Sequence, residues 1–364
     1  RRTLALPKDT PAVLGWCVLR EAREAVGQNS QRIAYQSDVP KFNLTIPKQR
    51  AEDKMDRIGN HLEIEPETIC LQIEKLLSLK LRELGKQGIV IGISGGFDSA
   101  IVAYVSGKAI GHDKVRLLYL PDRDSKAIHR QHAQLIANEL GIALEVRDIT
   151  SILDEMGIYE LLPISALPGQ LIREVAARFG KTLLGLGSGS SILEARFHPE
   201  PNSLVAKANA YAMSKHRLRM LLLYQQAEIF NLMVVGAANR TELMTGTFSQ
   251  WGCDQCADVM PLIHLYRSQL YPLASYLHLP KTIVEKPADP DFIPGLDDKE
   301  ELLGSFVEAD RILIGLEKGV GREELIQSYG AEAVDQIVSL VELSRPMRES
   351  PYVIEMDIQD PSIH

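Results

Sequence analysis

Apolar residues recur at every third or fourth position between residues 67 and 86, a spacing that predicts an amphipathic helix. Residues 89–93 follow as a short, largely β-branched apolar run, which indicates a buried parallel strand. The unit then repeats, with strands expected at residues 115–120 and 143–146 and a helix between them at 128–140. Because strands and helices alternate, the pattern predicts an α/β fold, a doubly wound parallel sheet with helices on both faces.

The second half of the chain has a different rhythm. Residues 151–205 carry four prolines and the glycine–serine stretch 185–191. Because no clear strand precedes that stretch, we expect an inserted mobile loop or lid rather than a phosphate-binding loop. Apolar spacing then predicts a helix at 206–230 and a strand at 232–235. A helical C-terminal part follows, with helices expected at residues 261–277, 300–317, 322–329 and 331–344.

The length of 364 residues suits one large domain or two smaller ones. We expect an N-terminal extension at residues 1–64, a main domain at 65–351 that contains the 151–205 insertion, and a tail at 352–364. The extension is polar and proline-containing from residue 28 to 49, which favours a solvated segment over a dimerisation arm or cap.

Composition excludes several classes of protein. A hydrophobic fraction of 45% with 24% charged residues is typical of a globular protein. The net charge of −8 argues against general nucleic-acid binding, and no apolar run reaches the roughly 18 residues of a membrane-spanning helix. Four cysteines are too few for a disulfide framework, so we expect a cytoplasmic location.

The strongest chemical signal is the segment Ser-Gly-Gly-Phe-Asp-Ser at residues 94–99, between the first predicted strand and a helix. Two glycines let the backbone approach an anion closely, and the free N–H groups of a helix N-terminus point at it. The carboxylate of Asp98 suits this setting if Mg²⁺ lies between it and phosphates. The segment lacks the Gly-Lys-Ser/Thr of the Walker pattern, so a different phosphate loop is indicated.

Polar residues also follow the other predicted strands. Glu242 lies after the strand at 232–235, where it could be a second metal ligand with Asp98 or only a helix N-terminal charge. Lys215 and Arg219 are four residues apart and share one face of the 206–230 helix. That face could be a solvated edge or could contact an anionic substrate.

Cys253 and Cys256 form a Cys-x-x-Cys pair. A zinc or iron–sulfur site usually needs two more ligands nearby, and spacing alone does not identify them. Three interpretations stay open: pocket-lining thiols without chemistry, a redox or metal site, and a sulfur-transfer role.

Taken in order, these motifs resemble the NAD synthetase family, which belongs to the N-type ATP pyrophosphatases within the adenine nucleotide alpha-hydrolase superfamily. The resemblance covers about residues 65–351. The matching segments are residues 94–99, Leu120-Pro121, Gly-Ala-Ala-Asn-Arg-Thr-Glu at 236–242, Thr245-Gly246, Gly-Cys-Asp-Gln-Cys-Ala-Asp at 252–258, Leu-Tyr-Arg-Ser-Gln at 265–269, Lys286-Pro287 and the basic residues before Pro351.

The resemblance implies a ligase that forms a C–N bond: ATP adenylates the carboxylate of nicotinic acid adenine dinucleotide, pyrophosphate leaves, and ammonia displaces AMP. It implies a homodimer, with ATP and Mg²⁺ as cofactors. Among the matched positions, it implies catalytic roles for Asp98, Glu242 and Arg267, with Asp98 and Glu242 as the Mg²⁺ ligands. It implies ATP or pyrophosphate contacts for Gly92, Ser94, Gly95, Gly96, Asp98, Ser99, Leu120, Arg219, Thr245 and Arg267. It implies contacts to the second substrate for Lys215, Asn239, Asp254 and Asp258.

Four departures from the family pattern lie where its dinucleotide pocket is shaped. They are Cys253–Cys256 with one inserted residue, Gln250 in place of lysine, Ala212-Met213 in place of Gly-Asn, and a 151–205 segment markedly longer than the family's. ATP activation is therefore better supported than the identity of the acceptor. One alternative is the same activation of another carboxylate, or sulfur transfer through Cys253 and Cys256. Another is a nucleotide-binding regulator without turnover. Since no amidase region precedes residue 65, free ammonia is the expected nitrogen donor.

Overall fold

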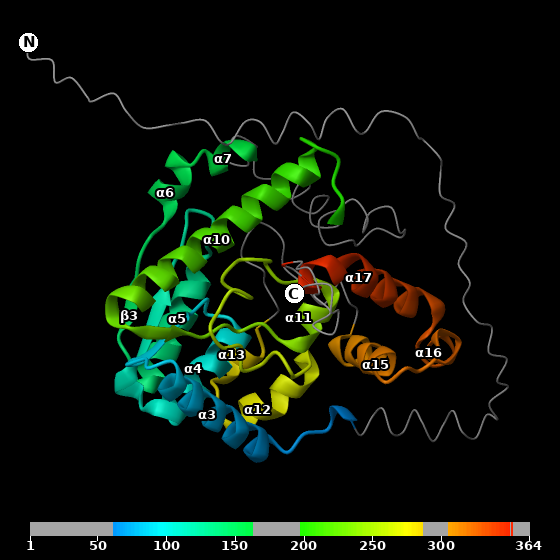
Figure 1. The fold of residues 1–364 in the computed structure, drawn as a ribbon, viewed down its shortest axis with the longest axis horizontal. Coiled ribbons are helices and arrows are strands. Elements are labelled where there is room, and N and C mark those ends of the chain that lie inside the picture. Colours follow the sequence, from blue (N-terminus) through cyan, green and yellow to red (C-terminus); the bar gives the residue numbers. More distant parts are fainter. Residues whose placement is uncertain (1–60, 163–196, 287–304, 350, 352–364) are drawn as a thin grey trace, which may run out of the picture. The chain divides into compact units, whose positions relative to one another are not determined.

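The computed structural model describes residues 61–162, 197–286, 305–349 and 351, all of which belong to one compact unit (Figure 1). The predicted N-terminal extension therefore lies almost wholly outside the described residues. The glycine–serine stretch at 185–191, the acidic segment at 287–304 and the tail at 352–364 also lie outside them.

The described residues contain a four-stranded sheet of β1 (Gly88–Gly92), β2 (Val115–Tyr119), β3 (Leu144–Val146) and β4 (Leu232–Val234). The strand order is β3-β2-β1-β4, and all three pairings are parallel. The register places Ile91 opposite Leu117 and Val90 opposite Val234. This confirms the predicted α/β fold with a parallel sheet, and it puts the carboxyl ends of the strands at one edge.

Alternate residues of the strands enter two different hydrophobic cores, which is the period of two expected for a strand buried on both faces. Val90, Leu118 and Val234 belong to the core that contains α10 (Leu204–Phe230), α15 (Phe306–Glu317) and α17 (Ala331–Glu349). Ile91 and Met233 belong to the core that contains α3 (Pro66–Glu83), α4 (Phe97–Ile110), α5 (Ala127–Leu140) and α12 (Leu270–Tyr276). Both faces of the sheet are therefore covered by helices.

The first group of helices comprises α3 (Pro66–Glu83), α4 (Phe97–Ile110), α5 (Ala127–Leu140) and α12 (Leu270–Tyr276). The second comprises α10 (Leu204–Phe230), α15 (Phe306–Glu317), α16 (Arg322–Tyr329) and α17 (Ala331–Glu349). Shorter elements are η1 (His112–Lys114), α6 (Thr150–Glu155), α7 (Ile158–Leu161), α11 (Arg240–Thr245), η3 (Arg267–Gln269) and α13 (Lys281–Val284). No described helix is both long and apolar enough to cross a membrane.

The helix predicted over residues 261–277 is wrong in its first half. Residues 261–266 form turns, and helical structure begins only with η3 and continues as α12. The backbone groups here are used by distant partners instead. Arg267 N–H donates to Thr241 Oγ1 at 2.9 Å, and Leu265 C=O accepts from Arg240 N–H at 2.7 Å. Tertiary hydrogen bonds thus replace the ladder of a regular helix.

The helix predicted to end at Ser344 continues to Glu349, through Pro346. Proline normally ends or kinks a helix because it lacks an N–H donor. Here the last turn is held by side chains on either side of the proline. Ser344 Oγ donates to Met244 C=O at 3.1 Å, and Arg348 donates to the same carbonyl at 2.9 Å.

The start of the predicted 151–205 insertion is not a loop. It contains α7 and most of α6, which begins at Thr150, and Leu153, Ile158, Tyr159 and Leu162 are buried in the core shared with α10. Local sequence did not reveal these helices because both are under two turns long and depend on packing.

Candidate active site

The phosphate-loop segment follows β1 directly, as predicted. Gly95 has φ of +72°, and a Cβ built on it would lie 2.2 Å from the carbonyl oxygen of His129. Only glycine fits that backbone and that approach. Gly96, which has ordinary dihedrals, is the N-cap of α4, and no described side chain caps that helix end. The first-turn N–H groups of α4 are therefore a suitable site for an anion.

Two serine hydroxyls hold the loop in shape. Ser94 Oγ and Ser99 Oγ lie 3.0 Å apart. Gly96 N–H donates to Ser94 Oγ at 3.1 Å, and Ser94 N–H donates to Ser99 Oγ at 3.3 Å. Both serines were predicted as pyrophosphate contacts, and their hydroxyls can turn toward an oxyanion because a hydroxyl rotates freely about its C–O bond.

Asp98, at the second position of α4, is the meeting point of three elements. Its Oδ2 pairs with Arg267 Nη1 at 2.5 Å, and its Oδ1 accepts from Asn239 Nδ2 at 3.1 Å. These partners are 169 and 141 residues away in sequence. The structure therefore brings together three residues that the sequence assigned separately to metal, ATP and acceptor.

Glu242 joins the same group through Asn239. Asn239 is the N-cap of α11, where its Oδ1 accepts from Glu242 N–H at 3.0 Å and its own N–H donates to Glu242 Oε2 at 3.3 Å. Both proposed metal-binding carboxylates thus contact one asparagine. Two carboxylates at the edge of a phosphate loop are the oxygen donors that Mg²⁺ prefers. The donor set fits the predicted metal.

Arg267 is buried among aromatic rings. Its guanidinium carbon lies 4.4 Å from the ring centre of Phe97 and 5.5 Å from that of Phe306. Burial, the largest single influence, works against its charge, but Asp98 together with Tyr271 and Glu242 outweighs burial and raises the pKa of Arg267. Its buried Nε has no hydrogen-bond partner among the described residues. Arg267 therefore keeps donor capacity for an oxyanion at this site.

Buried Asp310 positions Arg267 from α15, a role that sequence reasoning missed. Its carboxylate accepts from Thr241 Oγ1 at 2.6 Å and from Ser268 N–H at 2.7 Å. Thr241 Oγ1 in turn accepts from Arg267 N–H. Asp310 lies in an ordinary amphipathic helix, and no local motif separates it from a solvated carboxylate.

Lys215 and Arg219 lie on α10 and face the carboxyl end of β2. Lys215 is fully buried, with Nζ 3.1 Å from Asp122 Oδ1 and 2.5 Å from Asp124 Oδ2. Arg219 bonds Asp122 Oδ2 at 2.8 Å and Leu120 C=O at 3.0 Å. The sequence left open whether this helix face is a solvated edge or contacts an anionic substrate. The structure excludes a solvated edge, because both cations are paired with carboxylates of the protein.

Asp122 is a second residue that the sequence interpretation missed. Burial acts to raise its pKa, yet Lys215 and Arg219 outweigh burial, and the pKa of Asp122 is lowered. The available signal was its position two residues after a predicted strand end, beside Pro121. The Tyr211 hydroxyl, which contacts Asp124, completes the cluster.

Several other predicted ligand contacts are engaged with the protein. Thr245 Oγ1 donates to Thr241 C=O at 2.7 Å, inside α11. Asp258 accepts from Val234 N–H at 2.8 Å and from the Tyr224 hydroxyl at 3.2 Å, so it closes the end of β4. A Cβ at Gly92 would lie 3.1 Å from Leu223 of α10, which gives that glycine a packing role.

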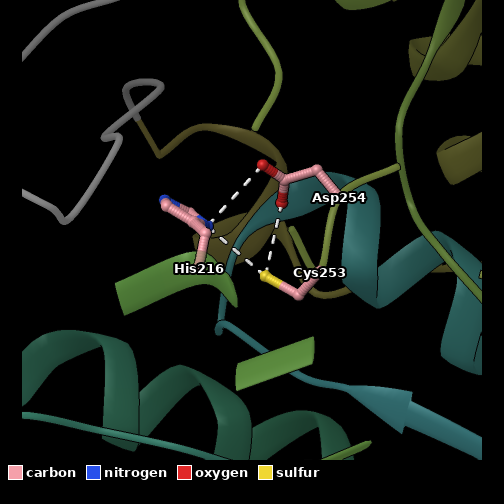
Figure 2. Close-up of side chains that lie close together, drawn as sticks. All are labelled: His216, Cys253 and Asp254. Carbon is pink, nitrogen blue, oxygen red and sulfur yellow. Dashed lines mark hydrogen bonds and ion pairs between the residues drawn. The ribbon is translucent and has the colours of Figure 1, made fainter. Parts of the chain in front are cut away.

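The loop that carries the Cys-x-x-Cys pair packs on α10. Cys253 Sγ lies 3.3 Å from His216 Nδ1 and 3.7 Å from Asp254 Oδ1. His216 Nδ1 is 3.7 Å from Asp254 Oδ2 (Figure 2). Burial, and then Asp254, raise the pKa of the Cys253 thiol well above its ordinary value; burial also raises that of Cys256. His216 was not among the predicted site residues, because a histidine on a helix gives no signal by itself.

Comparison with known proteins identifies the family. The model of the NAD synthase family matches residues 69–160 and 176–351. The chain belongs to the NAD synthase family. Its similarity to named family proteins includes 37% identity to the NH(3)-dependent NAD(+) synthetase of Thermotoga maritima, over 76% of this chain and 96% of that protein. The corresponding protein of Methanocaldococcus jannaschii is 30% identical over 78% of this chain and 95% of its own length.

Solved structures of the NAD synthase family and a related synthetase share the fold. The NMN synthetase of Francisella tularensis aligns with a TM-score of 0.59 at 24% identity, over 81% of this chain and all of that one. The NH3-dependent NAD synthetase of Campylobacter jejuni aligns with a TM-score of 0.57 at 22% identity, over 80% of this chain and all of that one. These likenesses agree with the parallel sheet described above.

Proposed function

We propose that this chain is an ammonia-dependent NAD synthetase, a ligase that forms a C–N bond. ATP adenylates the nicotinate carboxylate of nicotinic acid adenine dinucleotide with release of pyrophosphate, and ammonia then displaces AMP. The observation that carries the proposal is the junction of Asp98, Arg267 and Glu242 around Asn239 beside the phosphate loop, in a chain of this family.

Activation is needed because a carboxylate is a poor electrophile. Its oxygen attacks the α-phosphorus of ATP, the bond to the β-phosphate oxygen breaks, and pyrophosphate leaves with the electron pair. The developing negative charge is stabilised by the N–H groups of the α4 N-terminus, by the hydroxyls of Ser94 and Ser99, and by Arg267. The amide forms when ammonia attacks the mixed anhydride carbonyl and AMP departs.

Asp98 and Glu242 would hold Mg²⁺, which when bound neutralises phosphate charge. The carboxylate of Asp98 already pairs with the Arg267 guanidinium, so its position is suited to a positive partner. Asn239 holds both carboxylates in place, through its side-chain amide toward Asp98 and its backbone toward Glu242. This is the support that metal-binding carboxylates generally need.

Lys215 and Arg219 act in this proposal mainly by fixing the end of β2, where Leu120 contributes to the ATP site. Asn239, Asp254 and Asp258 remain the proposed contacts on the acceptor side. A homodimer and a cytoplasmic location complete the proposal. Light scattering of the purified chain tests the dimer, which a single-chain mass at micromolar concentration would overturn.

The deciding experiment follows pyrophosphate and NAD together, with ATP, Mg²⁺ and ammonium, with and without nicotinic acid adenine dinucleotide. We expect pyrophosphate release that depends on the dinucleotide, with NAD formed in equal amount. If pyrophosphate release instead requires another carboxylate, such as nicotinic acid mononucleotide, that compound is the acceptor substrate. Transfer of sulfur from a thiol donor would favour the Cys253 alternative, and nucleotide binding with no release would favour the regulator.

The variant Asp98→Asn gives the sharpest single-residue test of the site. It keeps the size of the side chain and removes the charge that Arg267 and Mg²⁺ share, so we expect a loss of about 10²-fold or more in pyrophosphate release. Asp154→Asn, on exposed α6, is the matched control and should keep normal activity. Equal rates for the two variants would remove Asp98 from the mechanism.

A further inference from the structure

The loop at residues 249–256 is tied to α10 by its backbone as well as its side chains. Cys253 N–H donates to His216 C=O at 3.2 Å. A Cβ added to Gly252 would lie 2.9 Å from His216 Cβ, so the loop backbone lies directly against the helix at this point. That contact places the side chains of His216, Cys253 and Asp254 toward one another, as Figure 2 shows.

The three groups are close enough together to be ligands of one small ion. Bond lengths of zinc to sulfur, nitrogen and oxygen, combined with tetrahedral angles, require ligand atoms about 3.4 to 3.6 Å apart. His216 Nδ1 lies 3.3 Å from Cys253 Sγ, and Asp254 approaches the pair with different oxygens, Oδ1 at 3.7 Å from the sulfur and Oδ2 at 3.7 Å from the nitrogen. One ligand atom from each residue lies within 4.8 Å of the other two, so small side-chain movements would complete the set. A thiol–carboxylate separation of 3.7 Å is long for a hydrogen bond, since a thiol is a weak donor.

Asp254 is itself held in position. Its Oδ2 accepts from Ser249 N–H at 3.1 Å and from Ser249 Oγ at 2.6 Å, while Oδ1 faces the Cys253 thiol. Oδ2 is thus anchored by Ser249 and faces His216, while Oδ1 faces the thiol; hydrogen bonds of this kind orient metal-binding carboxylates in proteins.

We propose that His216 Nδ1, Cys253 Sγ and Asp254 bind a zinc ion that fastens the 249–256 loop to α10. Nitrogen, thiolate sulfur and carboxylate oxygen are the donors of zinc sites, whereas Mg²⁺ and Ca²⁺ select oxygen alone. Binding releases the thiol proton of Cys253 to solvent. Three protein ligands leave a fourth position for water or a substrate atom. Cys256 is not part of the group of described residues that converge here.

Metal content and cobalt binding test the proposal on the full chain. We expect about one zinc per chain by elemental analysis of protein purified without chelator. Co²⁺ added to metal-stripped protein should give a thiolate–cobalt charge-transfer band and the intense visible bands of tetrahedral cobalt. Cys253→Ser should abolish the charge-transfer band, and His216→Ala should lower zinc content. Cys70→Ser is the matched control, because Cys70 is a buried thiol on α3 bonded to Glu74.

A further variant keeps the test decisive if ligand variants fold poorly. Ser249→Ala leaves all three ligands and the backbone N–H bond to Asp254, and removes only the shorter hydroxyl bond to that carboxylate, so cobalt affinity should fall about tenfold or more. The proposal is overturned by wild-type protein without zinc or a cobalt band, or by identical binding in wild type and Cys253→Ser. Loss of zinc from Cys256→Ser but not from His216→Ala would also overturn it.

Discussion

At the scale of single residues, the two glycines of the phosphate loop have different reasons to be glycine. Gly95 combines a positive φ with a backbone carbonyl 2.2 Å from where a Cβ would be. Gly96 has an ordinary backbone, and its added Cβ would contact only Ser94 Oγ, at 3.0 Å. The first glycine is therefore required by the fold, whereas for the second we predict that the approach of an anion is the reason.

Alanine at each position should separate these roles. We expect Gly95→Ala to lower the free energy of unfolding by roughly 2–4 kcal/mol, from backbone strain and the clash with His129. Gly96→Ala should leave it within about 1 kcal/mol but weaken pyrophosphate binding about tenfold or more, because the methyl group blocks the N–H groups. Denaturant titration and calorimetric binding measure the two quantities. Equal loss of stability in both variants would contradict the distinction.

The buried charges around Asp122 make a second prediction. Asp122→Asn leaves Lys215 and Arg219 without a shared carboxylate, which should cost about 3–5 kcal/mol of unfolding free energy at pH 7. Because the pKa of Asp122 is lowered in the folded state, its contribution is complete above the unfolded value of about 3.9 and is lost as pH falls through the folded value. The gap between wild type and variant should therefore narrow below about pH 4.

A control for this prediction is Asp113→Asn, on an exposed 3₁₀ turn. Its unfolding free energy should stay within about 0.5 kcal/mol of wild type. If the difference in unfolding free energy between wild type and Asp122→Asn stayed constant below about pH 4, the carboxylate charge would not be what stabilises the cluster.

The site residues divide clearly by what sequence can predict. Asp98 and Glu242 lie in local motifs after strands, and their meeting at one edge follows from parallel topology. The bonds that join them through Asn239 and Arg267 span over a hundred residues, and only folding reveals them. His216 carries no local pattern, and the one signal for Asp122 was its position just after a predicted strand; its ion pairs gave none, since a buried ion pair and a solvated one look the same in sequence.

At the scale of elements, α11 is a six-residue helix that is fixed at both ends. Asn239 and Glu242 form a capping box at its start. At its end, Arg348 of α17 donates to Leu243 C=O at 3.5 Å and Met244 C=O at 2.9 Å. Helices this short are not stable alone, so these tertiary bonds define it. The same bonds explain why apolar periodicity placed the end of α17 five residues early.

Substitution of two arginines one turn apart tests the hydrogen bonds between α17 and the end of α11. Arg348→Met removes a donor from the carbonyls of Leu243, Met244 and Val341, which should cost about 1–3 kcal/mol of unfolding free energy. Arg345→Met should cost under about 1 kcal/mol, because the Arg345 side chain is 70% exposed and its ion pair within the described residues is a surface pair with Glu349. Chemical denaturation of both variants measures the difference. A larger cost for Arg345→Met would show that charge, and not carbonyl capping, holds α17.

At the scale of the whole molecule, the alternation of β1 between two cores makes that strand the centre of the fold. The fold class was predictable because buried parallel strands and amphipathic helices each have a strong period. The segment at 261–266 was not, because its backbone bonds are made to distant residues.

The choice between ammonia and glutamine as nitrogen donor depends on the thiols of the whole chain. Transfer from glutamine requires a reactive thiolate, whereas burial raises the pKa of each thiol in the described part of the chain: that of Cys70 to about 11, and those of Cys253 and Cys256 above their ordinary value. Cys253 would in addition be bound to the zinc proposed above, so none of these thiols is suited to attack glutamine at neutral pH. We expect ammonium to support NAD formation and an equal concentration of glutamine to give at most a few per cent of that rate. Comparable rates would place an amidase activity elsewhere in the chain.

The ion pair between Asp98 and Arg267 has a kinetic consequence. If Asp98 holds Mg²⁺ as proposed, a lone divalent cation would have to compete with a buried guanidinium for the same carboxylate, so we expect weak binding of free Mg²⁺. We expect the metal to bind together with a nucleotide, because the phosphate oxygens would give Arg267 another partner. We expect the original ion pair to re-form after pyrophosphate leaves, which would favour product release.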